Sequence, residues 1–227
     1  AHGGAGSYEH MLEAIKAETA IGAYPGSKLY RPVGTKIEYT MHLEGLDIVI
    51  KLGGIHGSLE RKVIRSDRNT VVRDADVVSY YPLIAIKHRI FPEHLGPEFC
   101  NVYDRLRSRR VALPKTSLDR TTLKYALLVP FGSSNEANGV FYDPAYMLKI
   151  TMNGQLMLCM LAEQLANVKG IELIQVNTDG VTIRYPTTLQ DIVDKIYVWW
   201  QRYTGMELEF NDYRVMHIRD NNSYIAE

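Results

Sequence analysis

The chain has few cysteines, no excess of either charge and no long apolar run. Only Cys100 and Cys159 occur among its 227 residues. Neither belongs to a Cys-x-x-Cys pair or lies near paired histidines, so we expect no zinc site. Cys159 lies in an apolar helical pattern, which predicts a core position. A single disulfide stays an alternative, but so few cysteines favour a reducing, cytoplasmic setting.

Membrane and export signals are also missing from the sequence. No stretch approaches the roughly 18 consecutive apolar residues of a transmembrane helix. No signal peptide is present, and residues 1–7 have the composition of a cloning scar or linker. We therefore expect a protein that is neither secreted nor bound to a membrane.

The bulk composition is that of an ordinary globular protein. Apolar residues make up 46% and charged residues 23% of the chain, and 26 basic residues balance 26 acidic ones. A nucleic-acid-binding protein needs a local basic patch rather than a basic average, so zero net charge excludes little. The length suffices for one sizeable core, or one core with a small appended element.

Strand-like patterns dominate the first part of the chain and helical patterns the middle. Strands are predicted for residues 36–43, 46–52, 70–79, 171–176, 181–185 and the tail 207–225, and helices for 97–110, 117–129, 144–167 and 189–203. The last helix is amphipathic, with Ile192, Ile196, Trp199 and Tyr203 on one face. This order predicts an α+β fold, an antiparallel sheet backed by helices.

Two aspartates stand at the ends of predicted strands. Asp76 ends a β-branched run and is followed by a Ser-Tyr-Tyr-Pro turn, and Asp179 lies in the Asn-Thr-Asp-Gly turn of a predicted hairpin. Each has an ordinary explanation, because aspartate is common at strand ends and Asp-Gly is a frequent hairpin turn. Considered together, they can meet in space. Mg²⁺ takes one or two carboxylates along with waters and phosphate oxygens, and two such ions can activate a hydroxyl and stabilise a leaving oxygen.

Basic residues cluster in the predicted helices between these aspartates. Four arginines lie between Arg105 and Arg110, and Lys124 lies on the next helix. Arg105 and Arg109 are four residues apart, so they share one helix face. One guanidinium group can donate two parallel hydrogen bonds to the oxygens of a phosphate. The same pattern also fits a solvated charged face.

Three ordered segments resemble the motifs of family B DNA polymerases. Residues 76–82 (Asp-Val-Val-Ser-Tyr-Tyr-Pro) resemble motif A, residues 124–132 resemble motif B, and residues 176–180 (Val-Asn-Thr-Asp-Gly) resemble motif C. Residues 53–57 (Gly-Gly-Ile-His-Gly) resemble the glycine motif that precedes motif A in phage-type members. The resemblance implies a polymerase palm with a short two-helix fingers insertion. Palm segments would comprise residues 8–90 and 139–227, and the fingers residues 91–138.

The resemblance also implies a role for each matching residue. Asp76 and Asp179 would hold two Mg²⁺ ions, for which Mn²⁺ can substitute, with the Val77 carbonyl as a further ligand. Primer–template DNA and a dNTP would be the substrates. The amides near Ser79 and Tyr80 would contact the triphosphate, and the side chains of Arg105, Arg109 and Lys124 would bind it. Tyr81 would lie beneath the sugar and exclude a 2′-hydroxyl. Gly53, Gly54 and His56 would lie near the template.

The sequence also departs from the family pattern. Asn177 replaces the first aspartate of motif C and Gly180 a serine, and Leu128, Val129 and Phe131 replace the Asn, Ser and Tyr of motif B. The length leaves no room for the exonuclease and thumb domains of family members. Two alternatives therefore stay open: a palm module that binds nucleic acid without chemistry, and one piece of a split polymerase that needs a separate exonuclease or thumb polypeptide. The setting implied by the resemblance is the cytoplasm of a bacterial or phage-infected cell.

Overall fold

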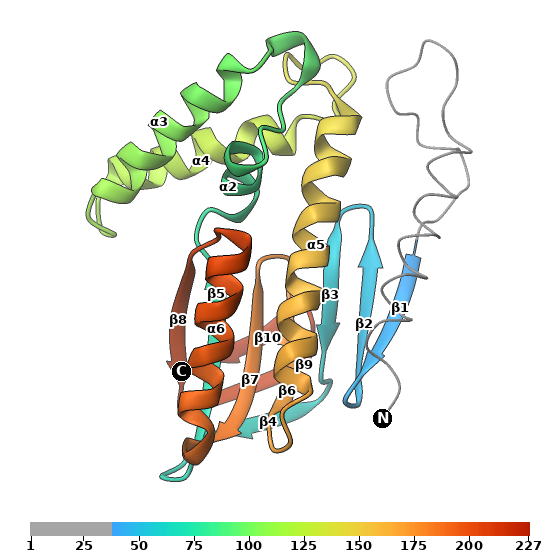
Figure 1. Cartoon of the computed structure of the whole chain (residues 1–227), viewed down its shortest axis with the longest axis vertical. Coiled ribbons are helices and arrows are strands. Elements are labelled where there is room, and N and C mark those ends of the chain that lie inside the picture. Colours follow the sequence, from blue (N-terminus) through green and yellow to red (C-terminus); the bar gives the residue numbers. More distant parts are fainter. Residues whose placement is uncertain (1–37) are drawn as a thin grey trace. The chain divides into compact units, whose positions relative to one another are not determined.

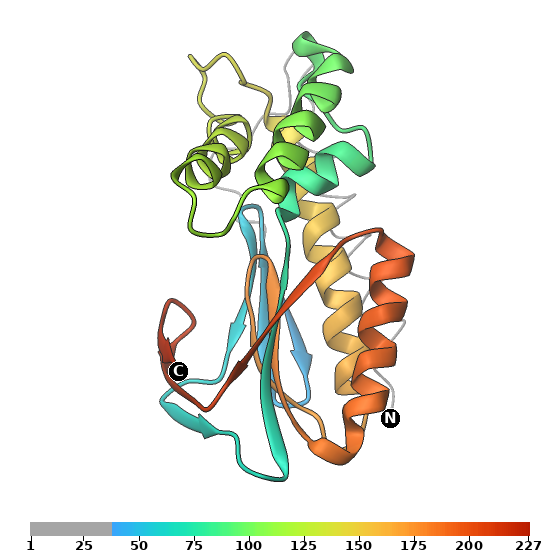
Figure 2. The same cartoon turned by 90° about the vertical axis from the view of Figure 1, so that its left-hand side faces the viewer.

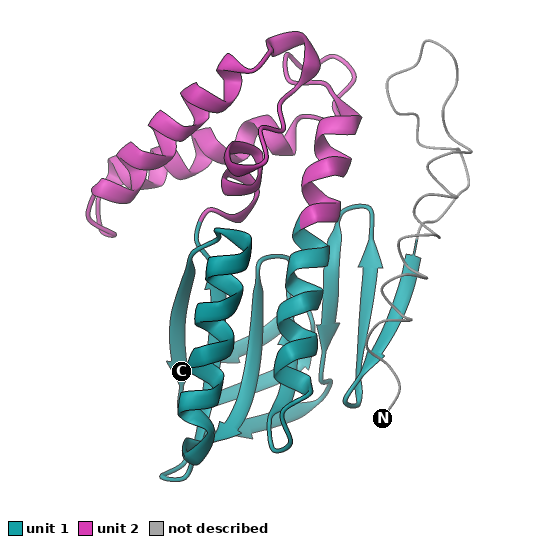
Figure 3. Ribbon diagram, in the orientation of Figure 1, with its two compact units in different colours: residues 1–14, 37–78, 154–227 teal, residues 15–36, 79–153 magenta. Residues whose placement is uncertain are grey.

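The computed structural model describes residues 38–227, so the expected linker at residues 1–7 lies outside the described residues. These residues divide into two compact units, shown in different colours in Figure 3. Unit 1 contains residues 38–78 and 154–227, and unit 2 contains residues 79–153. We describe each unit by itself.

Unit 1 is built on an antiparallel seven-stranded sheet. Its order is β1-β2-β3-β6-β7-β5-β8. The bounds are β1 Glu38–Leu43, β2 Leu46–Lys51, β3 Gly54–Ser58, β5 Thr70–Val77, β6 Glu172–Val176, β7 Gly180–Pro186 and β8 Leu208–Tyr213. A smaller sheet has the order β10-β9-β4, from β4 Lys62–Arg65, β9 Val215–Asp220 and β10 Ser223–Ala226.

Helices cover one face of the large sheet. The C-terminal part of α5 (Pro144–Ala166) and α6 (Gln190–Thr204), which follows the short η2 (Thr187–Leu189), lie side by side on that face (Figures 1 and 2). Strand β2 shows why the sequence folds this way, because Leu46, Ile48 and Ile50 alternate with more exposed residues and are buried. Burial of Cys159 on α5 confirms its predicted core position. Both cysteines are free thiols, so the disulfide alternative is wrong.

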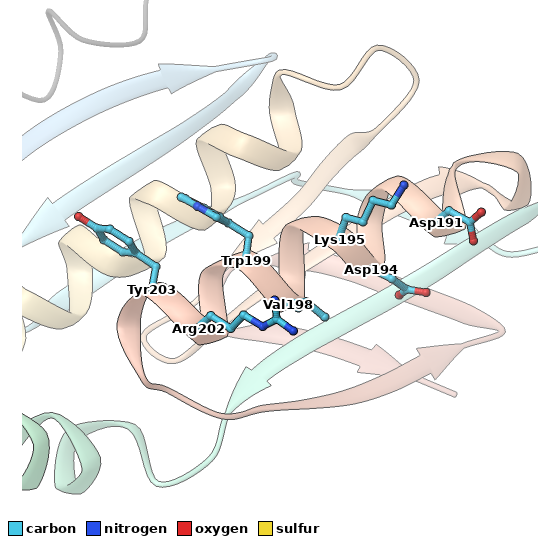
Figure 4. A pocket seen from close by; sticks show the side chains of 7 residues that line it. All are labelled: Asp191, Asp194, Lys195, Val198, Trp199, Arg202 and Tyr203. Atoms are coloured by element: carbon cyan, nitrogen blue, oxygen red, sulfur yellow. The ribbon is translucent and has the colours of Figure 1, made fainter.

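The predicted apolar face of α6 is wrong. Val193, Tyr197 and Trp200 are the buried residues of this helix. Trp199 and Tyr203, which were predicted for the apolar face, are 40% and 71% exposed. Two apolar stripes with helical spacing run along α6, one residue apart, and periodicity alone does not select between them. The exposed stripe borders a shallow hollow, which Figure 4 shows, lined by Asp191, Asp194, Lys195, Val198, Trp199, Arg202 and Tyr203.

Unit 2 is helical. It contains α2 Tyr80–Lys87, η1 Glu93–Leu95, α3 Glu98–Ala112, α4 Leu118–Gly132 and the N-terminal part of α5. The turn expected after Asp76 consists of Val78 and Ser79, and α2 begins directly after Ser79, whose backbone is left-handed (φ 54°). Pro82 lies within the first turn of α2, where proline is tolerated. Helix α4 also continues beyond its predicted end and includes Pro130 in its last turn.

Buried and charged side chains fix the helix ends of unit 2. Asp143 precedes α5 and accepts the Tyr146 amide at 3.0 Å with one carboxylate oxygen, which is the usual role of an N-terminal cap. Its other oxygen accepts the Glu93 amide at 2.8 Å and so anchors η1. At the end of α3, the Arg120 guanidinium donates to the Leu113 carbonyl at 2.7 Å. A cation at this end is favoured by the helix dipole.

Two glycines, Gly53 just before β3 and Gly57 within it, give a matched stability test. A methyl group on Gly57 would lie 2.8 Å from the Asp47 carbonyl oxygen and 3.0 Å from Ile48 Cγ1, whereas one on Gly53 would meet nothing within 4 Å. We expect Gly57→Ala to lower the free energy of unfolding by about 1–3 kcal/mol. Gly53→Ala should change it by at most about 0.5 kcal/mol. Urea titration of both variants measures the difference, and equal effects would contradict this packing.

Within 38–227, none of the helices combines the length and the apolar character that crossing a membrane requires.

Candidate active site

Asp76 and Asp179 lie at one end of two neighbouring strands of unit 1. Strands β5 and β7 pair in a register that places Asp76 opposite Gly180. The Val77 amide donates to the Asp179 carbonyl at 2.7 Å, and the Asn177 amide donates to the Gly180 carbonyl at 2.9 Å. The first bond joins the end of β5 to the β6–β7 turn, and the second closes that turn. The structure thus brings together the two aspartates that the sequence places about a hundred residues apart.

The absence of a side chain at Gly180 leaves room for the Asp76 carboxylate and is not needed for the turn conformation. The turn has Thr178 and Asp179 at its centre, and Gly180 is the first residue of β7. A Cβ atom on residue 180 would lie 2.3 Å from Asp76 Oδ1 and 3.2 Å from the Ala75 carbonyl oxygen. Real Cβ atoms do not approach other atoms to 2.3 Å. Glycine at this position therefore leaves the space that the Asp76 side chain occupies.

Negative charge accumulates around Asp76. Burial, together with the nearby carboxylates of Asp74, Asp179 and Glu209, raises the pKa of Asp76 to about 7. Asp74 is two residues before Asp76 and shares its side of β5, a signal that the sequence contains. Glu209 comes from β8, where it pairs with Asp76. Nothing in the local sequence marks it.

Tyr224 on β10 also belongs to this region. Burial raises the pKa of its hydroxyl, and the charges of Asp74, Asp76 and Asp179 add to the effect. Tyr224 lies in the predicted strand tail 207–225, and no sequence pattern assigns it to the site.

The glycine-rich segment lies beside the turn that carries Asp179. A Cβ on Gly54 would lie 3.4 Å from the Thr178 side chain. His56 Nδ1 lies 3.1 Å from Asn221 Nδ2, and the buried Gln175 amide donates to the Asn221 carbonyl at 3.0 Å. Burial lowers the pKa of His56, and the positive charge of Lys51 lowers it further. Gly53 is exposed at the start of this segment.

The carboxylates of Asp76 and Asp179 suit Mg²⁺ better than they suit a metal ion that is coordinated by protein side chains alone. Among residues 38–227, no group of three or more His, Cys, Asp or Glu side chains is arranged to hold a metal ion. Mg²⁺ does not need such a cage, because it retains waters and takes substrate phosphate oxygens alongside one or two carboxylates. The crowding of carboxylates that raises the pKa of Asp76 is the charge pattern that a divalent cation neutralises. Asp76 and Asp179 therefore fit this ion.

The predicted nucleotide-binding residues lie in unit 2. The Tyr81 ring packs against Phe131, with centroids 4.3 Å apart, and Tyr80 is buried. Ser79 Oγ accepts a hydrogen bond from the Arg110 guanidinium at 2.5 Å. Lys124 is exposed on α4. Motif A and the residue at the motif B tyrosine position thus contact each other through aromatic rings.

The arginines of α3 divide between two faces of the helix. Arg105 and Arg109 are exposed, and Arg105 lies 3.7 Å from the Glu98 carboxylate on the same helix. Arg110 lies on the inner face with Tyr103, whose hydroxyl donates to the Leu127 carbonyl of α4. The guanidinium that contacts the motif A segment is therefore that of Arg110, a residue that the sequence motif did not single out.

A basic hollow lies on the small sheet of unit 1. Strands β4, β9 and β10 form it, and Arg61, Lys62, Val63, His217, Ile218, Arg219, Ser223, Tyr224 and Ile225 line it. The charged residues of its lining are all basic, and Tyr224 contributes an aromatic ring to the same lining. Basic groups next to an aromatic ring suit the phosphates and bases of a nucleic acid.

Among known proteins, a solved structure has a fold similar to that of this chain. No protein-family model matches the chain, and no curated protein does. A solved family B DNA polymerase, from the hyperthermophilic archaeon Pyrobaculum calidifontis, matches with a TM-score of 0.50 and 16% sequence identity. The chain has a fold like that of part of a family B DNA polymerase. The match covers 98% of this chain and 32% of the archaeal polymerase chain, so the chain spans about a third of that polymerase.

Proposed function

We propose that the chain is the palm and fingers of a phage-type family B DNA polymerase, and that it transfers deoxynucleotides to a primer 3′-hydroxyl under the direction of a template. The pairing of β5 with β7, which sets Asp76 beside Asp179, carries the proposal. The polymerase-like fold supports it, as does the order of the three motifs. The likeness of residues 53–57 to the phage-type glycine motif supports the narrower assignment.

In this proposal the carboxylates of Asp76 and Asp179, together with the Val77 carbonyl, hold two Mg²⁺ ions. Bound there, the ions supply the Lewis acidity that activates the 3′-hydroxyl and stabilises the leaving oxygen. The 3′-oxygen forms a bond to the α-phosphorus, pyrophosphate leaves with the broken P–O bond, and the hydroxyl proton passes to solvent. The chain's own contribution is to hold a half-buried Asp76 carboxylate and an exposed Asp179 carboxylate at neighbouring strand ends.

Residues of unit 2 bind the nucleotide in this proposal. Amides near Ser79 and Tyr80 contact the triphosphate, and Arg105, Arg109 and Lys124 neutralise it. The Tyr81 ring, supported by Phe131, lies beneath the sugar and excludes a 2′-hydroxyl. Such a contact predicts discrimination against ribonucleotides.

Unit 1 provides the surface for DNA in this proposal. Gly53, Gly54 and His56 lie near the template strand, beside the turn that carries Asp179. The basic hollow on β4, β9 and β10 contacts phosphates of the primer–template duplex. Because such contacts release counterions, DNA binding should weaken steeply as salt concentration rises.

Primer extension tests the proposal. A labelled primer annealed to a longer template is incubated with the protein, Mg²⁺ and dNTPs at low salt, and elongated products are resolved by length. We expect extension that stops when a templated dNTP is omitted and that disappears in Asp179→Ala. Asp191→Ala, which removes an exposed carboxylate from α6, is the matched control and should extend as the wild type does.

The two alternatives give different results in the same assay. A module that only binds nucleic acid retards labelled DNA in a salt-dependent manner and produces no extension at any Mg²⁺ or Mn²⁺ concentration. A piece of a split polymerase extends the primer only after a second polypeptide with a thumb or exonuclease is added. Both alternatives deserve the test because Leu128 and Val129 stand where motif B has polar residues. The two apolar side chains are exposed on α4.

A further inference from the structure

Asp74 is a buried carboxylate in the middle of β5, the second strand from one edge of the large sheet. It is only 9% exposed, which is uncommon for a carboxylate unless hydrogen-bond partners compensate for the lost water. It shares one side of β5 with Asp76, because alternate side chains of a strand point the same way. Its register partners are Thr182 on β7 and Asn211 on β8.

Hydroxyl groups from the two neighbouring strands hold the Asp74 carboxylate. Thr182 Oγ1 donates to Asp74 Oδ1 at 2.7 Å, and the Tyr213 hydroxyl donates to Oδ2 at 3.3 Å. Thr182 is buried and belongs to β7, whereas Tyr213 ends β8. Each carboxylate oxygen is thus fixed from a different side. A carboxylate held at both oxygens has little freedom to rotate.

Asp76 lies between this fixed carboxylate and Gly180. The Asp74 and Asp76 side chains follow each other on one side of β5, and the charge of Asp74 acts on the Asp76 carboxyl. On the other side, Asp76 Oδ1 occupies space that only a glycine at position 180 leaves open. The orientation of the Asp76 carboxylate is therefore limited by two neighbours, of which one is held by the hydroxyls of Thr182 and Tyr213.

We propose that Asp74 is a positioning residue, which Thr182 and Tyr213 hold in place so that the Asp76 carboxylate points correctly for a divalent cation. This inference rests on the proposed function, because it assumes that Asp76 is a metal ligand. Loss of either hydroxyl leaves both Asp76 and Asp179 in the chain but allows Asp74 to rotate. The metal ion then meets a less ordered ligand.

Binding of Mn²⁺ alone tests the inference without any reaction. Free Mn²⁺ is measured by electron paramagnetic resonance during titration of wild type, Thr182→Val and Tyr213→Phe, each of which deletes one hydroxyl from a side chain of similar size. We expect the Kd for Mn²⁺ to rise by up to about 10-fold in each variant, the lower end of the effect of removing a direct partner of a metal ligand, because these hydroxyls act on Asp76 through Asp74. The controls Thr188→Val and Tyr203→Phe remove exposed hydroxyls and should bind as the wild type does.

The outcomes separate this inference from the proposed function. If Thr182→Val and Tyr213→Phe lower the melting temperature but leave the Kd for Mn²⁺ unchanged, Asp74 only joins strands and the inference is overturned alone. Should the wild type bind no Mn²⁺, both the proposed function and the inference are overturned. Tyr213 is half-buried, so Tyr213→Phe keeps the test decisive if the buried Thr182→Val variant does not fold.

Discussion

Asp76→Asn and Asp179→Asn are each expected to lower the rate of primer extension by at least about 10³-fold, since metal ions contribute several kcal/mol to such reactions and each factor of ten corresponds to about 1.4 kcal/mol. Asparagine keeps the size of the side chain but loses the charge that holds the cation. Single-turnover extension at saturating dNTP measures the loss, with Asp191→Asn as the control. A residual rate within tenfold of wild type would contradict the assignment of these residues as metal ligands.

The same Asp76→Asn variant should stabilise the metal-free protein at high pH. The pKa of Asp76 is raised to about 7 from an ordinary value of 3.8, so the folded state holds its proton more tightly than the unfolded state does. Ionisation of Asp76 therefore costs stability progressively as pH rises from about 4 to about 7, and the cost is complete above that range. Asparagine mimics the protonated form and avoids the cost.

Thermal melting in a metal chelator measures this effect. The melting temperature of Asp76→Asn relative to wild type should increase between pH 4 and pH 8. Addition of Mn²⁺ at pH 8 should raise the melting temperature of the wild type and leave that of the variant unchanged, because a ligand stabilises only the state that binds it. A difference between the two proteins that is constant across this pH range would mean that Asp76 does not titrate as its surroundings predict.

Some features of the site were predictable from the sequence because they are local. Asp76 ends a β-branched strand and Asp179 lies in a hairpin turn, and strand ends in one sheet often come together. Asp74 was also within reach, since it lies two residues from Asp76 on the same strand. Glu209 was not, because only the pairing of β8 with β5 brings it to Asp76. Such register depends on the whole sheet rather than on a local pattern.

Helix positions were predictable to a similar degree, and helix faces were not. The patterns at residues 97–110 and 144–167 correspond to α3 and α5. The motif drew attention to Arg105 and Arg109, whereas Arg110 contacts Ser79. Spacing shows which arginines share a face, but the packing of α3 against its neighbours decides which face is inward. Spacing alone likewise does not show which apolar stripe of α6 is buried, and the buried stripe lies one residue further along the helix than the predicted one.

The two adjacent tryptophans of α6 give the largest expected effect on stability. Trp200 is 0% exposed, and its indole N–H donates to the Met157 carbonyl of α5 at 2.7 Å. Trp199 is half-exposed and stacks on Tyr203, with centroids 5.9 Å apart. We expect Trp200→Ala to cost about 3–5 kcal/mol of unfolding free energy, the usual range for removing a buried aromatic side chain. Trp199→Ala should cost at most about 1 kcal/mol, because surface substitutions have small effects.

Urea unfolding of the two variants provides the measurement, and fluorescence provides an independent check. The chain has two tryptophans, so each variant retains one. Trp199→Ala leaves the buried Trp200, whose emission should lie at shorter wavelength than that of Trp199 in Trp200→Ala. Trp200→Phe retains most of the volume but removes the hydrogen bond from the indole to the Met157 carbonyl, which costs about 0.5–1.5 kcal/mol. A larger loss from Trp199→Ala than from Trp200→Ala would mean that α6 packs through the stripe that the sequence pattern first indicated.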